Sequence, residues 1–477
     1  MLLPDPIVVP AANATFEERT PFHLGTEEPI DAPAEITGAL PEWLRGALVR
    51  TCPAVFHTRD WHADHWFDGL GMLYAFRVAG PGAVRYQQRL LASQTVARYR
   101  EGKYKPAGFG TPLVRSWLRR IFEPVPEITD NANVNIVPMG DELVAMTESP
   151  RQLAVDPATL QVKGEVAYRD DLGEIIMSAH PHLDVARGQV VNVGSRYGAK
   201  SAVLIYEHGL GERSRRLVGE WRSPRLPYVH SFGLTAKRAV IIGHPLTVSP
   251  LSLLWSNRGF VDHFQWRPSE GTRLLVMDRG SGAVNEHLTD AMFVFHVIHA
   301  FDDGDDVVLD VVAYDDASVV DQLRRSALSA RMPDVAPKPI RLRIGARGVI
   351  REPLGDVGFE FPVVHYKRVS GKEHHVVWGT SLHGEGKRWR STIVRLDMHT
   401  RKTEAFSEPG WVFGEPIFVA EPSADEEGQG VLVVVGAHQD QQKSAMVVLD
   451  AETLAAKAWA TVPTAIPLGF HGSFVRG

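Results

Sequence analysis

The sequence contains one cysteine, Cys52, among its 477 residues. A lone cysteine excludes an internal disulfide and a CxxC metal pair, and it is typical of a reducing compartment. No run of about 18 apolar residues occurs, so no transmembrane helix is predicted. The first residues, 1–16, lack the basic region and the long apolar region of a secretory signal peptide. These absences predict a cytoplasmic protein.

An excess of basic charge is also lacking. The 51 lysines and arginines are balanced by 57 acidic residues, which gives a net charge of −6 and predicts no nucleic-acid partner. The 44% hydrophobic and 23% charged contents are those of a globular protein. A chain of this length suffices for two or three ordinary domains or for one large closed β structure.

Long helical periodicity is scarce, and the recurring unit is instead a hairpin of two apolar strands joined by a polar turn. We expect such hairpins at 73–89, 153–166, 204–221, 274–288, 393–406 and 447–462. No linker separates them, so residues 1–477 are predicted to form a single all-β domain. A seven-bladed β-propeller is favoured, because radial repetition protects the sheet edges and leaves an axial channel. Two stacked β sandwiches are the alternative.

One segment, 112–122, departs from the strand pattern. Its apolar side chains follow helical spacing, and its arginines lie elsewhere around the predicted helix. Apolar and aromatic side chains combined with arginines are typical of a helix that lies in a membrane interface. A second apolar stretch, 245–266, is a candidate to lie beside it. We expect this helical segment and the loops to cap the axial site, either in contact with a membrane or as ordinary lids.

Four histidines lie far apart in short apolar or aromatic frames: His180, His230, His296 and His471. In a propeller, each innermost strand can direct one side chain toward the axis, so four separated histidines can supply ligands to one central metal. Compact zinc motifs such as HExxH are absent. Spacing alone does not decide the matter, because most of the 20 histidines in the chain must be ordinary core or surface residues.

The residues around these histidines resemble the carotenoid cleavage oxygenase family, in family order and over nearly the whole chain. The matching stretches are HWFDGLGMLYAF (65–76), DNANVNIV (130–137), AHPH (179–182), VHSFGLT (229–235), FHVIHAF (295–301), GEPIFV (414–419) and GFHGSF (469–474). The resemblance implies a seven-bladed propeller with a non-haem Fe(II) on its axis. It makes His180, His230, His296 and His471 the iron ligands and the catalytic centre.

The resemblance also implies three glutamates that hydrogen-bond three of the ligand imidazoles. They are expected to be Glu148, Glu360 and Glu415, with Glu352 as a competitor for the middle position. Val134 falls where some relatives place a small side chain over an open iron position. Four neutral imidazoles suit Fe(II) and leave up to two positions open, so dioxygen is the expected co-substrate, with no reductant or 2-oxo acid. The glutamates would fix the tautomer and the orientation of the rings.

The remaining histidines and aromatic residues of the matched stretches are expected to support this site. His182 and His299 are predicted to support the ligands from behind or to be packing residues, rather than to be ligands themselves. Four aromatic residues are candidates to line a hydrophobic tunnel, although aromatic residues on strands belong to the core more often. They are Trp66, Phe67, Tyr228 and Phe232.

The favoured function is oxidative cleavage of a C=C double bond of a carotenoid or apocarotenoid. Central 15,15′ cleavage to retinal-type products is preferred, because the second and third histidine regions are most similar to the animal-type carotene oxygenases. Cleavage of a stilbenoid is an alternative, and Tyr99, Tyr104 and Lys105 are candidates to hold its phenol oxygen. The alternatives from other classes are a propeller metallohydrolase, whose calcium would need oxygen ligands, and a non-catalytic scaffold.

Overall fold

The structure of the chain is a computed structural model that describes residues 22–477 except 104–107, 114, 331–332, 334–335 and 386–387. Strands account for 50% and helices for 9%, which confirms a mostly β protein. Each of the six expected hairpins is an antiparallel strand pair.

Four hairpin turns of the described chain share one local motif, an aspartate followed three residues later by threonine or serine. The carboxylate accepts hydrogen bonds from the backbone N–H groups two and three residues further along. The next residue has a positive φ of 57° to 74°. The aspartates are Asp156, Asp278, Asp397 and Asp450. Because these turns form from local hydrogen bonds, the hairpins are encoded locally.

Seven sheets of four or five strands are present among the described residues. Two of them combine strands from the two ends of the chain. One contains β1 (Ile30–Pro33), β7 (Ala83–Leu90), β6 (Leu70–Gly80), β3 (Gly46–Val55) and β36 (Gly472–Arg476). The other contains β2 (Glu35–Gly38), β35 (Ala456–Val462), β34 (Ser444–Asp450), β33 (Gly430–His438) and β32 (Trp411–Ala420).

The other five large sheets use strands that are close together in sequence. The first has β11 (Val162–Glu165), β10 (Leu153–Val155), β9 (Glu142–Met146) and β8 (Asn135–Met139). The second has β12 (Ile176–Met177), β13 (His182–Asp184), β14 (Gln189–Arg196), β15 (Ala202–Gly209) and β16 (Arg216–Arg222). The third has β18 (Phe232–Leu234), β19 (Arg238–Gly243), β22 (Thr272–Asp278) and β23 (Val284–Thr289). The fourth has β24 (Phe293–Asp303), β25 (Asp306–Tyr314), β26 (Lys338–Gly345) and β27 (Gly348–Pro353). The fifth has β28 (Glu360–Val363), β29 (Val376–Glu385), β30 (Arg388–Asp397) and β31 (Thr403–Phe406).

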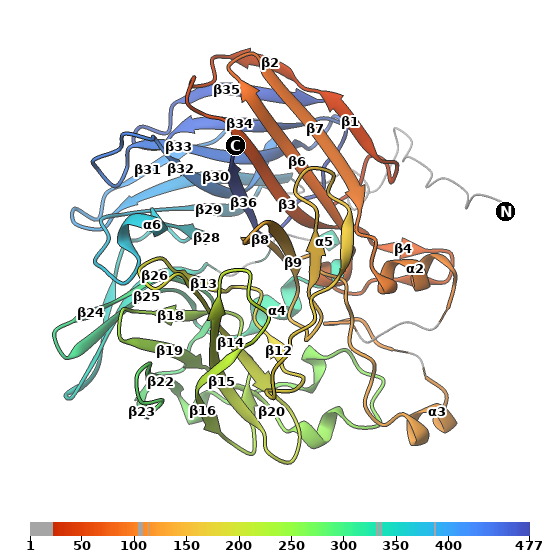
Figure 1. Ribbon diagram of the computed structural model, residues 1–477, viewed down its shortest axis with the longest axis vertical. Coiled ribbons are helices and arrows are strands. Elements are labelled where there is room, and N and C mark those ends of the chain that lie inside the picture. Colours follow the sequence, from red (N-terminus) through yellow and green to blue (C-terminus); the bar gives the residue numbers. More distant parts are fainter. Residues whose placement is uncertain (1–21, 104–107, 114, 331–332, 334–335, 386–387) are drawn as a thin grey trace.

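The sheets follow one another around the molecule. Edge strands of neighbouring sheets contact each other in the order β18, β24, β28, β32, β36 and β8. Strand β36 pairs with β3, and β2 pairs with β35, so strands from the two ends of the chain pair with each other in two sheets. Figure 1 shows these sheets at the top, where the red and orange strands β2, β3, β6 and β7 meet the blue strands β33–β35.

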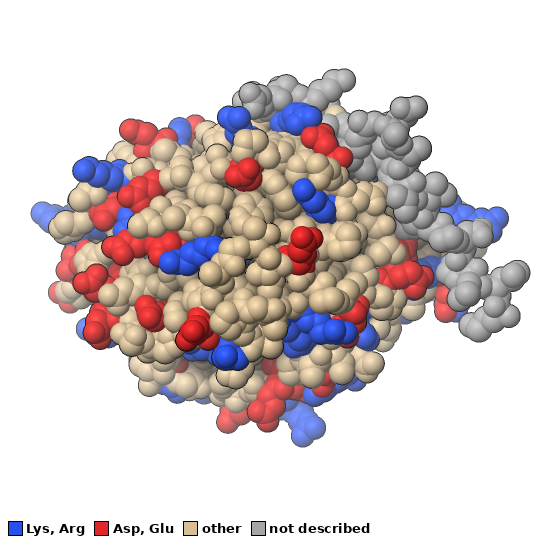
Figure 2. All heavy atoms as spheres, turned by 90° about the horizontal axis from the view of Figure 1, so that it is seen from above, with Lys and Arg blue, Asp and Glu red and all other residues tan. Residues whose placement is uncertain are grey.

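Two small sheets and several short helices occupy the connections. The small sheets are β4 (His57–Thr58) with β5 (Trp61–His62), and β17 (Leu226–Pro227) with β20 (Leu246–Val248) and β21 (Gln265–Trp266). The helices are α2 (Gln94–Arg100), α3 (Trp117–Phe122), α4 (Ser318–Gln322), α5 (Arg325–Ala330) and α6 (Tyr366–Val369). No helix within the described ranges is long and apolar enough to cross a membrane. On the face seen in Figure 2, basic and acidic side chains are intermingled.

The helix expected over 112–122 is shorter than predicted. Only α3 is helical, because the Ser116 hydroxyl accepts the N–H of Arg119 at 3.3 Å and caps the helix at that point. The residues before it bind the loop around 255–257 instead. The Leu113 N–H donates to the Asn257 carbonyl at 2.8 Å. The buried Arg115 guanidinium donates to the carbonyl of Ser256 in this loop and to that of Glu123 at the end of α3, so this arginine is structural rather than part of an exposed polar helix face.

Candidate metal centre

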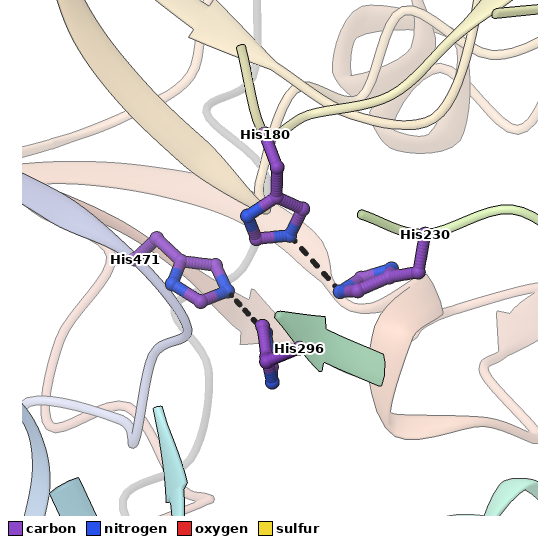
Figure 3. A group of neighbouring side chains, drawn as sticks. All are labelled: His180, His230, His296 and His471. Carbon is purple, nitrogen blue, oxygen red and sulfur yellow. Dashed lines mark hydrogen bonds between the residues drawn. The ribbon is translucent and has the colours of Figure 1, made fainter. Parts of the chain in front are cut away.

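Four histidine side chains meet where the edge strands converge. His180 lies between β12 and β13, His230 precedes β18, His296 lies on β24, and His471 directly precedes β36. Figure 3 shows the four rings pointing toward one another. One nitrogen from each ring lies within 4.8 Å of the others. The Nε2 atoms of His180 and His230 are 2.9 Å apart, and those of His296 and His471 are 3.1 Å apart.

A carboxylate accepts the Nδ1 hydrogen of three of these rings. The pairs are His230 with Glu148, His296 with Glu360 at 2.6 Å, and His471 with Glu415 at 2.7 Å. Glu352, the competing candidate, lies on β27 with its carboxylate 2.6 Å from Arg401, away from the cluster. The structure therefore brings Glu360, not Glu352, to the middle position. A carboxylate on Nδ1 fixes the orientation of the ring and leaves the Nε2 lone pair facing the centre.

Two of the carboxylates also accept a hydrogen bond from a tyrosine that sequence reasoning did not assign to this role. The Tyr228 hydroxyl donates to Glu148 at 2.8 Å, and the Tyr314 hydroxyl donates to Glu360 at 2.6 Å. Burial and the adjacent glutamate raise the pKa of each phenol well above its ordinary value, so both remain donors. Tyr228 precedes His230 by two residues, and alternate residues of an extended segment share a face. The spacing of two residues between Tyr228 and His230 could therefore have indicated from the sequence that Tyr228 lies beside the ligand.

The third carboxylate, Glu415, has an arginine beside it. Oε2 of Glu415 lies 3.3 Å from the buried Arg50 guanidinium and accepts the backbone N–H of Gly472 at 3.1 Å. Burial raises the pKa of the Glu415 carboxyl to about 7, although the adjacent Arg50 lowers it. Arg50 is more than 360 positions from Glu415 in the chain, so no local pattern connects them.

The protonation pattern fits a bound cation. Burial, assisted by the neighbouring imidazoles, holds the pKa of His180 and of His471 well below the ordinary value, so these rings are neutral. Nδ1 of His296 and Nδ1 of His471 are each hydrogen-bonded to a carboxylate, and the two Nε2 atoms face each other at 3.1 Å. A cation between these two Nε2 atoms would bind both of them. Ligands at right angles and about 2.1 Å from one ion lie about 3 Å apart, which matches the observed separations.

Side chains adjacent to the cluster connect the sheets to one another. The Ser178 hydroxyl donates to the carbonyl of His230, and the Ser231 hydroxyl donates to the carbonyl of Phe295 at 2.6 Å. Asn135 on β8 donates to the carbonyl of Ala179 at 2.7 Å. Each of these bonds reaches a residue that is a histidine of the cluster or its direct neighbour. The sheet ring and the cluster therefore share one hydrogen-bond network.

Two other histidines of the matched stretches, His182 and His299, face away from the cluster. The Nε2–H of His182 donates to the Phe232 carbonyl at 2.9 Å, and its Nδ1 accepts the Tyr366 hydroxyl at 2.7 Å. The Nε2–H of His299 donates to the Val369 carbonyl at 2.9 Å. The hydrogen-bond partners given above for the two rings lie outside the four-histidine cluster.

A cavity of about 560 Å³ reaches the cluster, and its walls are mostly apolar. His230, His296 and His471 form part of its lining. The aromatic wall is formed by Phe67, Phe109, Phe295, Phe361 and Phe470. A cavity of this kind accommodates an apolar ligand directly beside the imidazoles.

Comparison with known proteins decides the family. A family model described as retinal pigment epithelial membrane protein matches residues 22–476. The chain belongs to this family of carotenoid oxygenases. The resemblance found in the sequence is thereby confirmed. Carotenoid isomerooxygenase of Galleria mellonella is 30% identical, with 94% of this chain and 95% of that protein covered. Apocarotenoid-15,15′-oxygenase of Synechocystis is 29% identical, with 93% and 92% covered.

Solved structures of carotenoid oxygenases have the same fold. A variant of the Synechocystis apocarotenoid oxygenase superposes with a TM-score of 0.84 at 25% identity, with 95% of this chain and 97% of that chain covered. A cobalt-substituted form of the same protein gives a TM-score of 0.81 at 24% identity, with 96% and 98% covered.

In this carotenoid oxygenase, the expected tunnel residues are only partly placed as predicted. Trp66 and Phe67 line the cavity. Tyr228 instead donates a hydrogen bond to Glu148, and Phe232 is fully buried against the ring of His182. Phe232 was therefore wrongly expected in the tunnel, because core packing explains its position.

Four further candidates were expected near the iron or at a phenol oxygen of the substrate. Val134 lines the cavity, and its carbonyl accepts the N–H of His471 at 3.1 Å. Tyr99 also lines the cavity, from α2. Tyr104 and Lys105 lie outside the described residues.

Proposed function

We propose that this chain is a non-haem Fe(II) dioxygenase that cleaves a C=C double bond of a carotenoid or apocarotenoid to aldehyde or ketone products. The observation that carries the proposal is the convergence of four imidazoles, three of which line an aromatic cavity, in a member of the carotenoid oxygenase family. The substrates are an apolar polyene and dioxygen. The relatives described above are named for carotenoid chemistry, which supports this substrate class.

The proposed iron ligands are His180, His230, His296 and His471, with Glu148, Glu360 and Glu415 as the hydrogen-bond acceptors behind three of them. Nitrogen donors of this type suit Fe(II) and leave positions open for a small co-substrate. When bound, the iron supplies the activation of dioxygen. The glutamates hold their rings in the tautomer that presents Nε2 to the centre.

The cavity residues position the polyene and exclude water. The rings of Phe67, Phe295 and Phe470 line the same cavity as the imidazoles, so a conjugated chain would lie flat among apolar side chains. Phe295 lies with its ring centre 5.2 Å from that of His230, which places the apolar wall directly at the metal centre. We propose central 15,15′ cleavage to retinal-type products, and the names of the Synechocystis relative and of human β,β-carotene 15,15′-dioxygenase support this choice.

A stilbenoid substrate is the alternative within the same chemistry. It requires a polar group that holds a phenol oxygen, and Tyr99 is the candidate that the structure places in the cavity. A calcium-dependent hydrolase would need oxygen ligands, whereas the cluster offers nitrogen. A non-catalytic scaffold would not need converging imidazoles. The cluster therefore favours the oxygenase over both the calcium-dependent hydrolase and the scaffold.

We further propose that the seven large sheets are the blades of a seven-bladed propeller centred on the metal. The contacts between successive edge strands and the double closure by β36 and β2 support this count. The superposition on the apocarotenoid oxygenase supports the same architecture. In such a ring, the innermost strand of each sheet is adjacent to the axis, which explains how ligands far apart in sequence reach one point.

A patch around α3 is the proposed membrane contact. Its apolar side chains are exposed rather than packed as a lid, with Trp117 68% and Phe122 80% exposed. The other members of the patch are Leu118, Ile121, Val125, Leu251 and Trp255. Val125 also lines the cavity, so the patch adjoins the cavity mouth. An apolar polyene could then pass from lipid to cavity without crossing water.

The deciding experiment compares His296→Ala with His299→Ala, two histidines on the same strand β24. His296→Ala should lose iron and turnover, because its Nε2 faces the centre. His299→Ala should keep iron near one per chain. Metal analysis and product masses after incubation with β-carotene, an apocarotenal and resveratrol under oxygen provide the measurement. Retained iron and rate in His296→Ala would refute the ligand assignment, and a resveratrol product alone would select the stilbenoid alternative.

A further inference from the structure

Arg50 on β3 contacts two segments: the one that contains Glu415 and the one that carries His471. Its guanidinium is buried, with 1% of the residue exposed. Nη1 donates to the carbonyl of Glu415 at 3.0 Å, and Nη2 donates to the carbonyl of Phe470, directly before His471, at 2.8 Å. Nη2 also lies 3.3 Å from Oε2 of Glu415. One planar group thus binds the Glu415 backbone, the Glu415 carboxylate and the backbone that carries His471.

A glycine next to His471 leaves room for this arginine. Gly472 lies opposite Arg50 in the pairing of β3 with β36, and a Cβ at Gly472 would stand 2.5 Å from Cγ of Arg50. Any side chain at Gly472 would therefore displace Arg50.

The three carboxylates of the metal centre are not equivalent. Glu148 and Glu360 accept from neutral phenols, whereas Glu415 has a permanent cation beside it. Glu415 is 6% exposed, and a carboxylate that deep is costly unless it is paired. The planar, forked guanidinium can satisfy two carbonyls and a carboxylate together, which a lysine ammonium on a flexible stem cannot do with the same geometry.

We propose that Arg50 is a positioning residue of the metal centre: it orients the ring of His471 through Glu415 and Phe470, and it links closure of the sheet ring to metal affinity. This inference rests on the proposed function, because it assumes that the four histidines bind a metal. Arg50 lies on β3, which pairs with β36 where the C-terminal strand closes the ring. Formation of that strand pair therefore sets the fourth imidazole in place.

The test measures metal binding rather than turnover. Co(II) and Fe(II) dissociation constants are determined by chelator competition for the wild type, Arg50→Met and Arg50→Lys, together with the Co(II) absorption spectrum. Arg50→Met should weaken binding by about tenfold or more and change the spectrum, because His471 loses its orientation. Arg50→Lys should restore part of the affinity. Wild-type affinity and spectrum in either variant would overturn the inference.

Arg341→Met is the matched control. Arg341 is also a largely buried guanidinium, and it binds Asp310 through two 2.8 Å hydrogen bonds in the sheet of β25 and β26. Its loss should lower the thermal midpoint and leave the metal affinity unchanged. If it weakens metal binding as much as Arg50→Met does, the effect of Arg50 is only structural, and the inference fails.

A double-mutant cycle of Arg50→Met with Glu415→Gln tests whether Arg50 acts through Glu415. If Arg50 acts through Glu415, the combined loss of affinity should be clearly smaller than the sum of the two single losses. Additive losses would contradict the inference. If the wild-type protein binds neither Co(II) nor Fe(II), the proposed function itself is refuted. If the wild type binds metal and the Arg50 variants bind it with the same affinity, only the role of Arg50 is refuted.

Discussion

The Tyr314 hydroxyl donates a 2.6 Å hydrogen bond to one carboxylate oxygen of Glu360, and the other oxygen accepts the Nδ1 hydrogen of His296. Tyr314 also lines the cavity. A side chain of the substrate cavity is thus connected to a ring of the metal centre through a single carboxylate. A metal held by the four histidines would therefore be connected to the cavity wall through Tyr314 and Glu360.

Replacement of Tyr314 by phenylalanine should weaken metal binding. The change removes the donor to Glu360, which leaves the carboxylate less well oriented toward His296, and we expect an affinity loss of about tenfold. Chelator competition with Co(II) measures it. Tyr206→Phe is the control, because its buried hydroxyl bonds Asn192 on the neighbouring strand. Equal metal affinity in the two variants would contradict the prediction.

Glu360→Gln and Glu352→Gln form a matched pair eight residues apart. Glutamine at 360 can present an N–H to the ring instead of accepting from it, so we expect about 10- to 100-fold weaker iron binding. Glu352 pairs with Arg401 near the surface, and an exposed pair of this kind contributes only about 0–1 kcal/mol. Iron content and turnover distinguish the two. A larger loss in Glu352→Gln would show that the glutamate assignment is wrong.

Val134→Phe tests the cavity beside the cluster. Val134 lines the cavity, and its carbonyl holds the backbone N–H of His471, so a larger side chain there should obstruct the substrate while the ligands remain. We expect turnover to fall at least about tenfold with iron near one per chain, and a stability cost of about 1–3 kcal/mol from overpacking. Val134→Ala should keep turnover within a few-fold. Undiminished turnover in Val134→Phe would place the substrate elsewhere.

The membrane contact can be tested with exposed residues of similar type. Replacing Trp117 and Phe122 together by serine should reduce co-sedimentation with phosphatidylcholine vesicles several-fold, because the apolar area available for insertion is lost. Leu288→Ser on β23 is the control, since Leu288 is 61% exposed but distant in sequence from the α3 patch. If both variants sediment as the wild type does, the patch does not mediate lipid binding.

The hairpins were predictable because their information is local. Asp156 and Asp450, for example, each begin a turn whose hydrogen bonds span three residues. The four histidines were recognisable by family resemblance, and their convergence depends on contacts between distant strands. Arg50 could not be found from spacing, since its partners Glu415 and Phe470 lie hundreds of residues away.

Two expectations failed for a tertiary reason. The helix predicted over 112–122 begins only at Trp117, because the preceding residues bond to the loop at 255–257. Phe232 has the composition of a tunnel residue, yet it is enclosed by core side chains. In both places, a partner that is remote in sequence outweighs the local pattern.

The pairing of β36 with β3 has a consequence for biosynthesis. His471 is the last of the four imidazoles to leave the ribosome, and the strand that follows it needs a partner made more than 400 residues earlier. A growing chain can therefore present three of the rings but not the fourth. Binding of a metal by all four imidazoles would therefore require that β36 has been synthesised and has paired with β3.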